Sequence, residues 1–222
     1  MEQHFVIKGA LDSVTLKDFQ TQLLKIKFDG TMFDLYPTPG PNQKKDAEHI
    51  EIGTSKESEI SQNNLNSIWQ SINKIVTEKL GTIYPTYGVF NESVTPMVEH
   101  VDAIPTQRDY NLKPAYTLIL PLESDVKCHT VVWDVTSEYP VKFQDQKIVG
   151  STDYQHTEED KKLLSHCDKK VFGWGKPYFY EWIAGDIICI KRDHVHASDN
   201  FMVDNAGATK KSILLLTRFD YS

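Results

Sequence analysis

The sequence predicts a mainly β protein, a jelly roll that carries helices at its N-terminal end. Helical periodicity is concentrated before Gly81, and beyond it short apolar runs are separated by Pro, Gly, Asp and Asn. Regular short strands with turn residues between them are typical of a sandwich or barrel. We therefore expect a single domain over residues 1–222. In it, residues 1–83 form a helical and loop support, and residues 84–222 form the core with an insertion around 144–180.

Two helices are predicted before the β-rich part. Residues 15–18 resemble a capping box, and apolar residues then recur at a helical period. A second helix is expected to begin after Asn64 as N-cap and to end at Gly81. The polar, proline-containing segment 37–61 between them is expected to be loop, with a short strand at 49–52. The apolar helical positions are Leu16, Phe19, Leu23, Ile26, Leu65, Ile68, Trp69, Ile72, Ile75 and Val76.

The β-rich part contains six predicted strands and one more helix. The helix is expected to begin at Thr157, because acidic residues fill its first turn and Leu163 and Leu164 follow. It lies within the insertion, so helices come first along the chain and an interrupted antiparallel unit follows. The predicted strands span residues 84–90, 97–102, 116–122, 129–135, 182–191 and 212–221.

Composition excludes several classes of protein. The formal net charge of −7 disfavours binding to phosphate backbones, so nucleic acid is not an expected partner. No run reaches the roughly 18 apolar residues of a membrane span, and the first residues do not resemble a signal peptide. Three cysteines without a CxxC motif indicate reduced thiols. We therefore expect a soluble, cytoplasmic protein.

A histidine and a carboxylate lie two positions apart in a predicted strand, at His100 and Asp102. Alternate side chains of a strand share a face, so both are expected to point the same way. Two histidines and one carboxylate form the facial triad of non-haem iron(II) oxygenases, which leaves coordination positions open. The pair thus predicts a metal site that needs a third ligand. The alternative is that the two residues have no functional role and are simply exposed polar residues of a strand.

The third ligand is expected after the apolar strand 187–190, where two histidines compete. We favour His196, because Ser198 and Asn200 follow on the same strand face and could donate hydrogen bonds around it. His194 lies nearer the turn and is the alternative. A zinc hydrolase could use the same three ligands in another geometry.

At these residues the chain resembles the iron(II)- and 2-oxoglutarate-dependent dioxygenase superfamily, in a style similar to its prolyl-hydroxylase-like and phytanoyl-CoA-hydroxylase-like branches. The resemblance covers roughly residues 84–221. It rests on the HxD motif, the strand that follows it, the Gly-Asp strand before the distal histidine and the basic start of the last strand. These features are His100 and Asp102, residues 116–122, residues 185–196, and Lys210 to Ser212.

The resemblance implies a double-stranded β-helix (a cupin-like jelly roll) that binds Fe(II) and 2-oxoglutarate and uses O2 as co-substrate. A basic residue on the last strand would bind the distal carboxylate of 2-oxoglutarate. Lys210 and Lys211 are the candidates, with Arg218 as a third, and they follow His196 later than is usual in the family. Ser212 and Thr117 are expected to line the same cofactor site.

The implied activity is hydroxylation of an unactivated C–H bond in a small molecule or a protein side chain. Retention of Asp102 argues against halogenation, since the family's halogenases carry a small residue there. His129, Trp133 and Trp174 are candidates for lining the substrate cavity, and the alternative for each is ordinary packing or exposure. Two other functions remain open: a cupin-like metalloenzyme independent of 2-oxoglutarate, and a non-catalytic jelly-roll binding or structural module.

Overall fold

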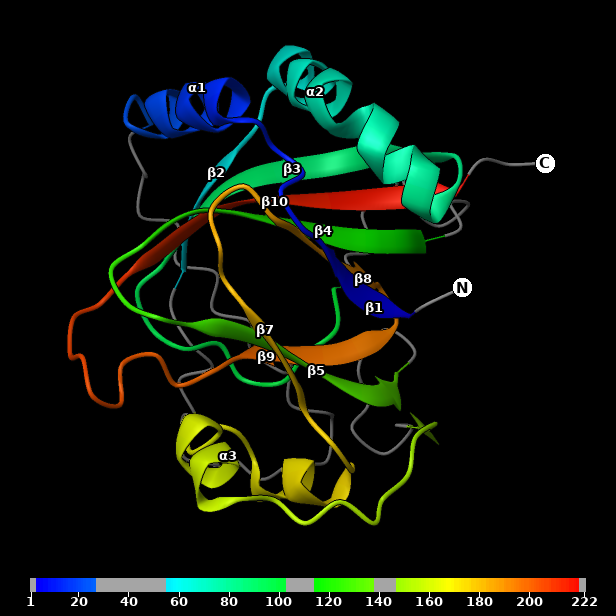
Figure 1. Ribbon diagram of the computed structural model, residues 1–222, viewed down its shortest axis with the longest axis vertical. Coiled ribbons are helices and arrows are strands. Elements are labelled where there is room, and N and C mark those ends of the chain that lie inside the picture. The colour runs from blue at the N-terminus through cyan, green and yellow to red at the C-terminus, as the bar shows by residue number, and fades with distance from the viewer. Residues whose placement is uncertain (1–2, 27–54, 103–113, 138–146, 220–222) are drawn as a thin grey trace, which may run out of the picture.

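The computed structural model describes residues 3–26, 55–102, 114–137 and 147–219. Two antiparallel sheets face each other, and helices cover the outer side of each (Figure 1). The larger sheet has the strand order β1-β8-β4-β10-β3-β2, and in the smaller sheet β5 pairs with β6, β7 and β9. The strands are β1 (His4–Ile7), β2 (Ser55–Glu59), β3 (Ile83–Ser93), β4 (Pro114–Ser124), β5 (His129–Thr136), β6 (Lys147–Ile148), β7 (Tyr178–Glu181), β8 (Ile187–Lys191), β9 (His194–Ser198) and β10 (Lys210–Phe219).

Strand β8 shows how the sequence separates the inside of this jelly roll from its outside. Ile188 and Ile190 pack between the two sheets, whereas Ile187 and Cys189 face the helices on the far side of the larger sheet. All four side chains are fully buried. A strand covered on both faces reads as a continuous apolar run, which is why this segment lacks polar alternation.

The two N-terminal helices pack on the outer face of the larger sheet (Figure 1). They are α1 (Ser13–Leu23) and α2 (Gln62–Leu80). Gly81 ends α2 with a φ of 76°, as predicted, because glycine adopts this left-handed conformation without steric cost. Both predicted starts were wrong by three residues. The N-cap of α1 is Asp12, whose carboxylate accepts a hydrogen bond from the Thr15 amide, and α2 begins at Gln62 rather than after Asn64.

The insertion covers the outer face of the smaller sheet with α3 (Glu158–Leu163) and the 3-10 helix η1 (Lys169–Gly173) (Figure 1). The predicted helix start at Thr157 is confirmed. Thr157 and Asp160 form a capping box, with the Thr157 hydroxyl accepting from the Asp160 amide and the Asp160 carboxylate from the Thr157 amide. Acidic residues in the first turn also suit the positive end of the helix dipole.

Several strand predictions need correction. Residues 182–191 form the end of a turn and one strand, because Gly185 (φ 96°) reverses the chain between β7 and β8. Residues 97–102 make only one bridge, between His100 and His196. Strands β1 and β2 were not predicted: each lies at an edge of the larger sheet and is formed by pairing with a strand distant in sequence. The predicted strand at 49–52 lies outside the described residues.

Truncation of a core leucine tests how far α2 stabilises the sheet. Leu65 is 2% exposed in α2, whereas Leu24 at the end of α1 is 81% exposed. We expect Leu65→Ala to lower the free energy of unfolding by about 2–5 kcal/mol, through lost burial and a residual cavity. The matched control Leu24→Ala should change it by less than about 0.5 kcal/mol. Urea unfolding measures both, and equal effects would contradict the packing of α2 on the sheet.

Candidate metal centre

Three side chains from two separate segments converge between the sheets: His100, Asp102 and His196. One ligand atom from each lies within 4.8 Å of the others. The His196 Nε2 atom is 3.1 Å from Asp102 Oδ2, and the His100 Nε2 atom is 3.5 Å from Asp102 Oδ1. The imidazole ring centroids are 4.3 Å apart. The three residues predicted to form a facial triad are therefore brought together by the fold.

A pair of backbone hydrogen bonds aligns the two segments. The His100 amide donates to the His196 carbonyl at 2.8 Å, and the His196 amide donates back to the His100 carbonyl at 2.9 Å. In β9 the neighbouring Val195 and Ala197 pack on the outer side of the sheet, so the His196 side chain points inward. The bridge thus places the two histidines opposite each other.

Both histidines of the triad have their ring orientation set by a backbone carbonyl. The Nδ1 atom of His100 lies 2.8 Å from the carbonyl of Val98, and that of His196 lies 3.1 Å from the carbonyl of His194. A carbonyl only accepts, so each Nδ1 must donate, and in the neutral ring the lone pair is on Nε2. Both lone pairs therefore face the Asp102 carboxylate, as a shared metal ion requires.

Asp102 carries the observation that best fits a metal ion. Its Oδ2 atom is buried and accepts no hydrogen bond within the described part of the chain, although His196 Nε2 is close by. A buried carboxylate oxygen in this state is costly unless a cation meets it. The carbonyl of Asp102 accepts a hydrogen bond at 2.9 Å from Nε of Arg192, a side chain that is 4% exposed. Arg192 thereby ties the HxD segment to the end of β8.

The residues of the triad shift one another's pKa values. Burial raises the pKa of Asp102, but the nearby imidazoles of His196 and His100 outweigh this and hold it well below 3.8. For His100, burial lowers the pKa, yet the hydrogen bond and charge of Asp102 raise it above 6.5 overall. Without a metal ion, a proton on His100 thus partly compensates the carboxylate.

The alternative ligand His194 lies on the same inward face of β9 but is not part of the triad. Its Nδ1 atom bonds Asp193 at 2.8 Å, and its ring lies 6.0 Å from that of His4. The predicted support from Asn200 is also absent, because its side-chain amide donates to Ser165 instead.

Of the two candidate lysines, only Lys210 is buried. Its side chain is 2% exposed, and the ammonium lies 4.1 Å from the centre of the Trp182 ring and 5.1 Å from that of Phe201. Burial lowers the pKa of Lys210, and the nearby Cys128 and Asp199 oppose this in part. Among the described residues no carboxylate comes within ion-pair distance of it. A buried cation in this state is costly unless an anion meets it.

The remaining cofactor candidates are placed differently. Lys211 is partly exposed and paired with Glu123 at 3.2 Å. Ser212 is buried on the same strand face as Lys210. Thr117 is fully buried, and its hydroxyl has no hydrogen-bond partner in the part of the chain that the structure describes. It pairs in register with Leu216, however, which lies six residues from Lys210 along β10. At about 3.3 Å per residue that is some 20 Å, so Thr117 and Lys210 do not share one small site.

Arg218 lies near the end of β10 with its guanidinium 5.6 Å from the Tyr84 ring. The prediction that Trp133 and Trp174 line a cavity is wrong: they pack against each other, 5.5 Å apart, on the outer side of the smaller sheet. His129 shares that strand face and bonds Asp199 at 2.6 Å. Alternation showed which residues share a face, but it could not show which face is inward.

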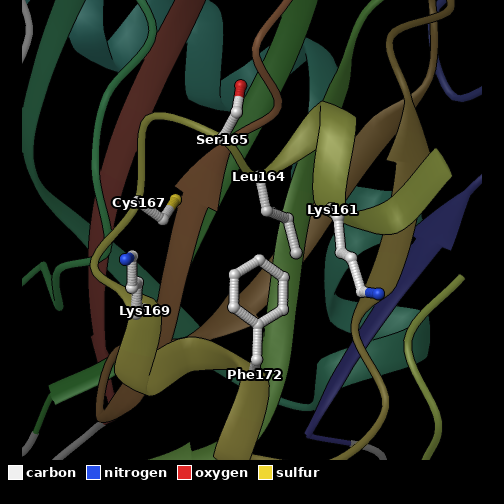
Figure 2. A pocket seen from close by; sticks show the side chains of 6 residues that line it. All are labelled: Lys161, Leu164, Ser165, Cys167, Lys169 and Phe172. Carbon is white, nitrogen blue, oxygen red and sulfur yellow. The ribbon is translucent and has the colours of Figure 1, made fainter. Parts of the chain in front are cut away.

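A surface pocket of about 480 Å³ lies away from the triad. Figure 2 shows that its six lining side chains come from α3, η1 and the segment joining them. They include Cys167, whose pKa burial raises beyond that of an ordinary thiol. The pocket belongs to the cover of the smaller sheet and shares no residue with the triad. Its lining residues are Lys161, Leu164, Ser165, Cys167, Lys169 and Phe172.

No family model and no curated protein matches the sequence, but solved structures share its fold. The non-heme alpha ketoglutarate dependent epimerase SnoN from nogalamycin biosynthesis aligns with a TM-score of 0.58 at 13% identity, over 98% of this chain and 79% of its own. The collagen prolyl hydroxylase of Paramecium Bursaria Chlorella virus-1 aligns with a TM-score of 0.53 at 9% identity, over 99% and 97%.

A Pseudomonas putida prolyl-4-hydroxylase also aligns, with a TM-score of 0.53 at 10% identity, over 99% of this chain and 94% of its own. At such identities the likeness establishes the fold. The predicted double-stranded β-helix is thereby confirmed. No helix in the described part of the chain has the length and apolarity needed to cross a membrane.

Metal binding at the triad should depend on pH in a definite direction. The pKa of His100 is raised, and a metal ion needs the neutral ring, so binding must displace its proton. We expect Co(II) affinity to rise with pH from 6 upward, by at most about tenfold per pH unit, because binding displaces one proton from His100. The affinity should level off above the pKa that His100 has in the folded protein. Titration calorimetry measures this. His156→Gln, outside the triad, should behave like the unchanged protein, and a pH-independent affinity would contradict the assignment.

Proposed function

We propose that this protein is an Fe(II)- and 2-oxoglutarate-dependent oxygenase that hydroxylates an unactivated C–H bond. The observation that carries the proposal is the triad, in which two imidazole Nε2 atoms and a buried carboxylate oxygen face one another inside a jelly roll. Among the described residues that oxygen has no hydrogen-bond partner. Two histidines and a carboxylate suit non-haem iron(II) and leave positions for further ligands. The structural likeness to 2-oxoglutarate-dependent enzymes supports it.

In this proposal each part of the chain has a limited task. His100, Asp102 and His196 hold the iron, which when bound with 2-oxoglutarate supplies the oxidising chemistry from O2. Arg192 keeps the HxD segment in place through the Asp102 carbonyl. The buried inner faces of the two sheets keep water from the reacting groups.

We further propose that Lys210 binds the distal carboxylate of 2-oxoglutarate. It is a buried cation on the inward face of the last strand, held over two aromatic rings and without a carboxylate partner among the described residues. Ser212 lies two positions on and shares its face. The unpaired state of all three cysteines is consistent with the cytoplasm as its location.

Anaerobic addition of Fe(II) and then 2-oxoglutarate tests the function directly. We expect a weak visible charge-transfer band, since the cofactor would chelate the iron held by the triad. His100→Ala and His196→Ala should abolish the band, and the control His156→Gln should keep it. Absence of the band in the unchanged protein would contradict the proposal. A band that survives His196→Ala but is lost in His194→Ala would overturn the choice of distal ligand.

Lys210 and Lys211 form a matched pair for testing the anchor. Removal of one partner from a buried charge pair costs about 2–5 kcal/mol. We therefore expect Lys210→Met to raise the 2-oxoglutarate concentration for half-maximal band intensity by about a hundredfold. Lys211 is paired at the surface with Glu123, so Lys211→Met should change it by less than about threefold. Equal effects of the two substitutions would refute the assignment of Lys210.

A further inference from the structure

A second group of polar side chains lies on the inward faces of four strands, next to the triad but outside it. We call this group the inner wall. It contains two imidazoles, each in contact with a carboxylate, and two tyrosines whose rings both lie against the ring of His4. None of them takes part in holding the metal ion. The inner wall consists of His4 from β1, Asp134 from β5, Tyr178 and Tyr180 from β7, and His194 from β9.

The orientation of the inner wall follows from its neighbours. Val6 in β1, Val132 in β5 and Tyr180 in β7 belong to the cluster packed between the sheets. His4, Asp134 and Tyr178 each lie two positions from one of these residues along the same strand, so they share the inward face. In β9, His194 shares the face of the metal ligand His196. Two residues of strand span about 7 Å, so the wall begins beside the triad.

The hydrogen-bond donors of His4 and the two tyrosines are already bonded to other members of the wall. The Nε2 atom of His4 lies 3.2 Å from Asp134 Oδ1, and the Tyr178 hydroxyl donates to Asp134 Oδ2 at 3.1 Å. A carboxylate only accepts, so Nε2 of His4 donates, and in the neutral ring its Nδ1 atom accepts from the Tyr180 hydroxyl at 2.7 Å. The same hydroxyl lies 3.3 Å from the His4 carbonyl, to which it donates when the ring is protonated. Asp134 therefore polarises a chain that runs through His4 to Tyr180.

His194 offers an acceptor of the same kind. Its Nδ1 atom lies 2.8 Å from Asp193 Oδ1 and must donate to it, which in the neutral ring leaves the lone pair on Nε2. That Nε2 atom is buried without a hydrogen-bond partner in the described part of the chain, and the residue is 1% exposed. A buried nitrogen in this state costs about 1–3 kcal/mol unless a ligand meets it.

The charges of the wall select the kind of donor. Asp134 is one-third exposed and has no lysine or arginine within ion-pair distance among the described residues. Asp193 is 3.5 Å from Lys191, a partly exposed pair of modest strength. A cationic donor would meet both the carboxylates and the faces of the tyrosine rings. The ammonium of Lys176 already lies 5.5 Å from the centre of the Tyr178 ring.

We propose that the inner wall binds a primary ammonium group of the substrate. The assignment rests on the proposed function, because it is the iron beside His194 that would act on a C–H bond near this group. An ammonium supplies three donors and no acceptor, which matches the lone pairs of His194 Nε2 and Asp134. The group could belong to a free small amine or to a lysine side chain.

Saturation-transfer NMR with three probes of equal length tests the wall without turnover. We expect the metal-free full chain to bind n-pentylamine about tenfold more tightly than 1-pentanol, the gain of one charge-assisted hydrogen bond. Pentanoate should not bind the wall. Asp134→Asn should remove the preference for the amine, and His194→Phe, on a different strand, should weaken amine binding independently. Urea unfolding confirms that each variant is folded.

The matched control is Asp204→Asn, which removes a carboxylate paired with Lys162 at the surface and should leave the preference unchanged. Equal affinities for amine and alcohol, or a preference that survives both wall substitutions, would overturn the proposal. The Fe(II)–2-oxoglutarate band would then still stand, so the two failures are distinct. In the loaded enzyme, 2-oxoglutarate consumption with 1,5-diaminopentane or with a lysine-containing peptide distinguishes a free amine from a protein side chain.

Discussion

The pair of backbone hydrogen bonds between His100 and His196 is the constraint on which the rest of the centre depends. It joins a segment with little regular structure to a strand buried on both faces. Once that register is set, the two imidazoles lie opposite each other and Asp102 follows two positions on. A slip of one residue in β9 would turn Val195 inward and His196 outward, removing the distal ligand altogether.

The surrounding structure holds this register from both sides. On the inside, Arg192 fixes the carbonyl of Asp102 from the end of β8. On the outside, the buried carboxylate of Glu99 forms an ion pair at 3.1 Å with Lys170 of η1, which is partly exposed. Glu99, directly before the first ligand, is thus anchored to the helical cover, and Asp102 is anchored to the larger sheet. Such outer contacts orient ligands whose own bonds are few.

The sequence allowed prediction of features that depend on local pattern. The apolar face of α2, its end at Gly81 and the capping box at Thr157 follow from helical period and capping chemistry. The HxD spacing placed His100 and Asp102 together. Features that depend on distant pairing were missed: β1 forms only because β8 offers its edge, and His4 meets Asp134 only across two sheets.

The inward and outward faces were the hardest to predict. Residues 129–135 alternate in the expected way, yet the tryptophan at 133 faces the helical cover while Asp134 faces the interior. The large aromatic residue suggested a cavity lining. It lies instead on the outer face of the strand, which the helices cover and which therefore needs apolar side chains. Arg192 was likewise missed, because its role depends on a carbonyl 90 residues away in sequence. The only sequence signal was a basic residue two positions before His194.

The two ends of the interior differ in charge: a buried lysine lies on one side of the triad, and acceptor groups lie on the other. Lys210 lies beside Cys128 and Phe201, near the start of β5, where only an anion would be well accommodated. His194 pairs in register with Thr136 at the opposite end of β5 and belongs to the acceptor-rich wall. His196 pairs with Val132 between them. An anionic co-substrate and a cationic substrate would each be repelled from the other's end, so the same fields that bind them also prevent their exchange.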